Sequence, residues 1–107
     1  MAYDEELDQR VSDIVSGWGA TRKKMFGGTA YLLNGNMMAG VHGERLILRL
    51  GDDDGSAALE EPFASPFDLT GRPMVGWVQV DPPGFEGARL QDWLVRARKF
   101  ASSLPPK

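Results

Sequence analysis

The sequence predicts an α+β fold, a two-layer sandwich in which helices cover one face of an antiparallel sheet. Three observations lead to it. Strand patterns in the middle of the chain are joined by tight turns, which make neighbouring strands antiparallel. An amphipathic helical pattern lies near each end of the chain. Small residues recur along one strand face, where a helix can pack closely on the sheet.

The first predicted helix runs from Asp4 to Trp18. Its apolar residues are spaced by four, three, one and three positions, which is typical of a helix with one buried face. Gly17 and Gly19 are expected to end it. The apolar residues are Leu7, Val11, Ile14, Val15 and Trp18.

Residues 22–50 predict three antiparallel strands. Asn34-Gly35 is the preferred pair for a type I′ hairpin turn, and Gly43-Glu44 fits a type II′ turn. The two turns set a register, because a one-residue slip would turn every side chain to the other face. The expected pairs are Leu32 with Met37, Ala30 with Ala39, Met37 with Leu50, Ala39 with Leu48, and Val41 with Leu46.

The predicted register gives the meander one apolar face and one mixed face. The apolar face is expected under the helices, with Gly28, Ala30 and Ala39 allowing close approach. The mixed face is expected to be open. It carries Thr29, Tyr31, Leu33, Met38, His42, Arg45, Ile47 and Arg49.

The second half of the chain predicts a short helix, two strands and a long helix. The helix is expected from Gly55 to Glu61, followed by strands over Phe63 to Leu69 and Met74 to Val80, with a turn at Thr70 to Pro73. The last helix follows Phe85 and is closed by Pro105-Pro106. The expected order is α-β-β-β-α-β-β-α within one domain, residues 1–107.

Three segments give the chain a family resemblance. They are KKMFGGTAYLLNGNMMAG, FDLTGRPMVGWVQVDP and the closing WLVRARKFASSLPPK. Together they resemble the N-terminal domain of the TfoX/Sxy family, which comprises competence regulators and their single-domain relatives. The resemblance runs from about Tyr3 to the end of the chain. It implies the same two-layer architecture and a non-enzymatic regulatory or interaction role.

Composition narrows the classes of function. The net charge of −3 repels phosphate backbones, and the only basic run is Arg22-Lys23-Lys24, so direct nucleic-acid binding is disfavoured. Cysteine is absent, which excludes disulfides and thiolate metal sites and suits a reducing cytoplasm. No apolar run is long enough for a membrane span or a signal peptide. We therefore expect a cytoplasmic protein.

No pattern of catalytic or cofactor-binding residues stands out. His42 is the only histidine and has no nucleophile or carboxylate at a spacing that predicts catalysis. Asp52-Asp53-Asp54-Gly55 lacks the alternating ligands of a calcium loop and directly precedes a predicted helix. Gly27-Gly28 lacks a phosphate-loop pattern. We expect no metal and no cofactor.

Two functional hypotheses remain. The first is an interaction module that binds a regulatory protein or a second copy of itself through the open face, because aromatic, methionine and arginine side chains are enriched in interfaces. Its predicted residues are Tyr31, Met38, Ile47, Arg45, Arg49 and Trp77. The alternative is a small-ligand-binding or enzymatic domain that holds an anion with Arg22, Lys24, Arg49 or Arg72.

Overall fold

The structure is a computed structural model that describes residues 4–25, 28–67 and 75–106. Six strands form one antiparallel sheet in the order β1-β2-β3-β4-β6-β5. They are β1 (Thr21–Met25), β2 (Gly28–Leu33), β3 (Asn36–His42), β4 (Arg45–Arg49), β5 (Ala64–Pro66) and β6 (Trp77–Val80).

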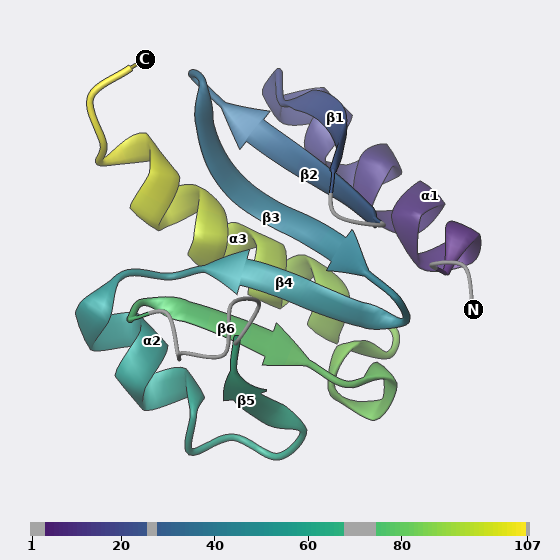
Figure 1. The fold of residues 1–107 in the computed structure, drawn as a ribbon, viewed down its shortest axis with the longest axis vertical. Helices are drawn as coiled ribbons and strands as arrows, with labels where there is room; N and C mark the ends of the chain where they lie inside the picture. The colour runs from purple at the N-terminus through teal and green to yellow at the C-terminus, as the bar shows by residue number, and fades with distance from the viewer. Residues whose placement is uncertain (1–3, 26–27, 68–74, 107) are drawn as a thin grey trace.

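Two helices form the second layer. In Figure 1 the sheet lies in front of α1 (Glu5–Val15) and α3 (Arg89–Ser102), while α2 (Asp52–Ala58) lies at one end of the sheet. Short 3₁₀ helices follow α1 and precede α3, at η1 (Ser16–Trp18) and η2 (Pro82–Phe85). The predicted two-layer α+β fold is confirmed.

The hydrophobic core lies between the two layers. Leu7, Val11 and Val15 of α1 are buried, as the helical spacing predicted. The Asp4 carboxylate caps α1 by accepting the Leu7 N–H at 3.1 Å, and Gly19, with φ +82°, closes the helical segment. Facing strand residues and α3 complete the core, with Val41, Leu46, Leu48, Val78, Val80, Leu90, Trp93, Leu94 and Ala97.

Both predicted hairpin turns are present. Asn34 and Gly35 have φ values of +55° and +83°, as a type I′ turn requires, and Gly43 has φ +61°. Leu32 pairs with Met37, Val41 with Leu46, and Ala39 with Leu48, as predicted.

A β-bulge makes part of the predicted register wrong. Tyr31 pairs with Ala39, and Ala30 pairs with Gly40 rather than with Ala39. Met38 is the extra residue, so the consecutive side chains of Met38 and Ala39 both enter the core.

The bulge reverses the two faces of β2. Tyr31 and Leu33 lie under the helices, whereas Leu32 lies on the other face, which is the opposite of the prediction. The predicted pair of Met37 with Leu50 also fails, because the ladder of β3 with β4 ends at Ala39 and Leu48.

The chain before Gly28 forms a strand that the sequence did not predict. β1 pairs with β2 from Met25–Gly28 to Thr21–Leu32 and forms one edge of the sheet. A Cβ on Gly28 would lie 1.9 Å from the carbonyl oxygen of Val41. The close neighbour of Gly28 is therefore β3, and the expected helix contact at this position is wrong.

The predicted short helix begins three residues earlier than expected, at Asp52 instead of Gly55. The three aspartates form its first turn, where carboxylates favour the positive end of the helix dipole. Arg96 of α3 bonds Asp54 at 2.7 Å and Glu61 at 2.7 Å, so it ties both ends of this segment to α3. The predicted turn at Thr70 to Pro73 lies outside the described residues.

Candidate functional site

We call the face of the sheet that points away from α1 and α3 the open sheet face. Tyr31 and Met38 were expected on it, but both side chains are buried in the core, with exposed fractions of 1% and 0%. The bulge at Met38 explains both errors. Ile47 does belong to this face, since its neighbours Leu46 and Leu48 enter the core, but it is also buried.

Arg49 and Trp77 remain as the partly exposed pair of the predicted interface. They are register partners on β4 and β6, and the Arg49 guanidinium lies 5.5 Å from the Trp77 ring centroid. It also lies 5.6 Å from the Phe100 ring of α3. Phe67 stands beside Trp77, with ring centroids 6.2 Å apart. We call Arg49, Trp77, Phe67 and Phe100 the arginine-aromatic cluster.

Arg49 and Arg45 differ in their partners. Arg45 forms an ion pair with Asp81 at 2.9 Å, and both side chains are about half exposed. Among the described residues, the Arg49 guanidinium contacts two aromatic rings and no carboxylate or other hydrogen-bond acceptor. The guanidinium N–H donors of Arg49 are therefore available to a partner.

The residues of the anion-binding hypothesis do not form one site. Arg22 lies on the helix side of β1, where it bonds Asp8, whereas Arg49 lies on the open sheet face three strands away. Lys24 is exposed on β1. Arg72 lies outside the described residues.

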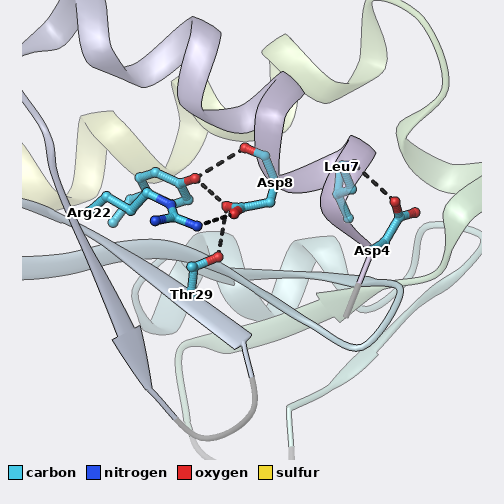
Figure 2. Close-up of polar contacts among 6 residues, drawn as sticks. Asp4, Leu7, Asp8, Arg22 and Thr29 are labelled. Carbon is cyan, nitrogen blue, oxygen red and sulfur yellow. Dashed lines mark hydrogen bonds and ion pairs between the residues drawn. The ribbon is translucent and has the colours of Figure 1, made fainter. Parts of the chain in front are cut away.

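A buried polar cluster that the sequence reasoning missed joins α1 to β1 and β2. Figure 2 shows the Asp8 carboxylate of α1 facing Arg22 and Thr29. It accepts hydrogen bonds from Arg22 at 2.6 Å, from Thr29 at 2.8 Å and from the Tyr31 hydroxyl. The Tyr31 hydroxyl also donates to the main-chain oxygen of Asp8 at 3.1 Å. Asp8 is 5% exposed.

The contacts within the cluster shift the pKa values of Asp8 and Tyr31 in opposite directions. Burial raises the pKa of Asp8, but hydrogen bonds from Arg22, Tyr31 and Thr29 outweigh it, so the pKa falls below its usual 3.8. Burial, followed by the bond to the Asp8 carboxylate, raises the pKa of Tyr31 to about 12. Near neutral pH the carboxylate is ionised and the phenol is protonated, so neither group is poised for proton transfer.

One sequence signal could have found this cluster. Asp8 precedes Val11 by three positions and Val15 by seven, which places it on the buried face of the first helix. A carboxylate at such a position needs hydrogen-bond donors from the sheet. Thr29 and Tyr31 supply them only because the bulge turns both toward α1.

The other residues considered for catalysis or metal binding do not form a site in the described residues. His42 is exposed at the end of β3. Asp54 is paired with Arg96. Across residues 4–25, 28–67 and 75–106, no three histidine or acidic side chains come together in an arrangement that could hold a metal ion.

Comparisons with known proteins gave one match. A family model described as the TfoX N-terminal domain matches residues 13–101. No curated protein and no solved structure matches the chain. In the part of the chain that the structure describes, no helix has the length and apolarity needed to cross a membrane.

Proposed function

The chain belongs to the TfoX N-terminal domain family, and from this premise we propose that it is a non-enzymatic interaction module that binds a regulatory protein through the open sheet face. The arginine-aromatic cluster is the centre of the proposed interface. The observation that carries the proposal is the Arg49 guanidinium, which is held against aromatic rings and has no carboxylate partner among the described residues.

The position of the cluster supports this role. Arg49 and Trp77 are partly exposed, so a second protein can reach them, whereas Phe67 is buried and Phe100 comes from α3 in the helix layer. Tryptophan and arginine dominate binding energy in protein interfaces when a partner removes them from water. Trp77 and Arg49 are partly buried in the free chain, so part of their surface is already removed from water before a partner binds.

The chemistry of Arg49 also indicates the kind of partner. A planar guanidinium binds a carboxylate through two parallel hydrogen bonds. The expected partner therefore presents an aspartate or glutamate side chain beside apolar groups that pack on Trp77. The polar cluster supports a non-enzymatic role, because Tyr31 donates to Asp8 and near neutral pH neither group is poised for proton transfer.

The proposal can be tested by substituting the cluster. The purified chain, tagged at one terminus, would capture partners from the cytoplasm of its native cell, with quantification by mass spectrometry. Arg49→Gln combined with Trp77→Ala should weaken capture of a specific partner by about 2 kcal/mol or more, or roughly thirtyfold. Sedimentation velocity over a concentration series tests whether the partner is a second copy.

Two controls make the result specific. Arg98 of α3 lies 4.8 Å from the Trp18 ring, so Arg98→Gln removes a similar cation–π contact from the helix layer. His42→Ala changes an exposed residue at the end of β3. Both controls should bind the partner like the native chain. Unchanged capture by a folded Arg49→Gln/Trp77→Ala variant would refute the proposed interface.

A further inference from the structure

A small pocket lies away from the open sheet face, between α3, η2 and the turn that leads into β5. Its volume is about 310 Å³, and its lining includes Phe63, Gly84, Arg89, Asp92, Trp93 and Arg96. The Asp81 N–H, directly before η2, donates to the Phe63 carbonyl oxygen of this turn at 2.9 Å. This volume is at the lower end of the range of small-ligand sites.

Phe63 occupies a backbone position that suits glycine. The Ala64 N–H donates to the Glu61 carbonyl oxygen at 3.3 Å, so Pro62 and Phe63 are the central residues of a turn. Phe63 has φ +69°. Proline followed by a residue with positive φ is typical of a type II turn, which usually has glycine or asparagine in the second place. A bulky residue there carries steric strain.

Burial does not account for the phenylalanine. Its side chain is 48% exposed, so the core does not require it. Phe63 packs closely on Gly84, which has no side chain. A Cβ on Gly84 would lie 3.1 Å from the Phe63 Cβ and 2.6 Å from a Val80 methyl. Strained residues that structure alone does not explain are concentrated at binding sites.

The pocket also offers one cation and one anion without ion-pair partners. Arg96 is occupied by Asp54 and Glu61, and its guanidinium stacks on Trp93 at 4.6 Å from the ring centroid. Arg89 and Asp92, by contrast, are exposed and form no ion pair with another described residue. They are three residues apart on α3 and so lie on neighbouring turns of one face.

We propose that this pocket binds a small zwitterion with one apolar ring, of which a free aromatic α-amino acid is the simplest example. The ring would pack against Phe63 beside Trp93. The ligand carboxylate would meet the Arg89 guanidinium, and its ammonium group would meet the Asp92 carboxylate. This site is independent of the arginine-aromatic cluster and of the proposed protein partner.

The test is a titration of the ¹⁵N-labelled full chain with L-phenylalanine, followed by two-dimensional NMR. Saturable shifts are expected at the amides of Phe63, Gly84 and Arg89. For a ligand of this size, the usual free energy per non-hydrogen atom gives a dissociation constant of about 2 mM. Phenylacetate lacks the ammonium group and phenethylamine lacks the carboxylate, so each should bind several-fold more weakly.

Variants separate the contributions of the ring and the charges. Phe63→Gly should weaken binding by about tenfold, since it removes the exposed ring and keeps a backbone that glycine adopts readily. Arg89→Gln should weaken the binding of phenylalanine and phenylacetate but not that of phenethylamine. Asp92→Asn should weaken the binding of phenylalanine and phenethylamine but not that of phenylacetate. Arg98→Gln is the matched control on the same helix and should bind like the native chain.

Three results would each overturn the inference. They are the absence of saturable shifts at the pocket amides, equal affinity for phenylacetate and phenylalanine, and full affinity in Phe63→Gly. The Arg49→Gln/Trp77→Ala variant should bind phenylalanine normally. A failure of this site and a failure of the proposed protein interface can therefore be told apart.

Discussion

Replacing Asp8 with alanine should destabilise the chain by about 3 kcal/mol. The largest loss is at Thr29, whose buried hydroxyl has the Asp8 carboxylate as its acceptor at 2.8 Å. A hydrogen bond to a charged group contributes about 1.5 to 3 kcal/mol, and an unpaired buried hydroxyl adds its own desolvation cost. Tyr31 loses less, because it keeps the main-chain oxygen of residue 8 at 3.1 Å. Arg22 has 41% of its side chain exposed, so water replaces most of its ion pair.

Urea unfolding with a matched control measures this effect. Asp13 lies on the same helix, and its carboxylate accepts a hydrogen bond from Gln9 at 2.8 Å on the exposed surface. Asp13→Ala should therefore change the free energy of unfolding by less than about 0.5 kcal/mol. Equal urea midpoints for Asp8→Ala and Asp13→Ala would refute the importance of the buried cluster.

The contribution of the charge itself depends on pH. The pKa of Asp8 lies below its usual 3.8 in the folded chain, so the unfolded chain takes up the proton first as the pH falls. The stabilisation by the carboxylate is then complete above about pH 5 and is lost as the pH falls through the folded pKa. Asp8→Asn should be less stable than the native chain at about pH 7 and closer to it at about pH 3. The same difference at both pH values would show that charge is not the cause.

Three further predictions follow from burial and backbone geometry. Tyr31→Ala should lower the free energy of unfolding by about 3 to 5 kcal/mol in urea melts, because Tyr31 is a core residue. A residue on the open face, where the sequence placed Tyr31, would leave stability unchanged. Ala39→Leu should cost more than about 1 kcal/mol by overpacking, and an unchanged midpoint would exclude a tight helix contact. Phe63→Ala should cost about 1.5 kcal/mol, whereas Phe63→Gly should cost less because glycine relieves the strain; the opposite order in thermal melts would contradict that strain.

Local signals in the sequence predicted the parts of the fold that depend on local chemistry. The φ values of Asn34 and Gly35 are those for which the Asn-Gly pair is selected, so the turn could be identified without tertiary information. The first helix was predictable from its apolar spacing, which lies within a few residues of sequence, although α1 ends at Val15 and a 3₁₀ turn continues to Trp18.

Long-range geometry accounts for the errors. Nothing in the sequence Met37-Met38-Ala39 marks Met38 as a bulge, because methionine is compatible with either face of a strand. The strand β1 was missed because most of its side chains are polar and exposed, which is typical of an edge strand rather than of a buried one.

The positions of the candidate residues could be predicted only in part for the same reason. Arg49 and Trp77 are neighbours, as expected, because the register of β4 was right and Trp77 lies across from Arg49 on β6. Tyr31 was misplaced because its face depends on the bulge. Phe63 was overlooked because its significance lies in a backbone angle that the residue type disfavours, and composition does not reveal such an angle.

The attachment of α2 to α3 has a consequence for local opening of the chain. A seven-residue helix that contains a glycine and a serine is too short to be stable alone. It is held by Ala58, which is buried in the core, and by Arg96, which bonds Asp54 within the helix and Glu61 just beyond it. In native-state hydrogen exchange, the amides of α2 should therefore open at a lower free energy than those of the fourteen-residue α3, and equal protection of the two helices would contradict this.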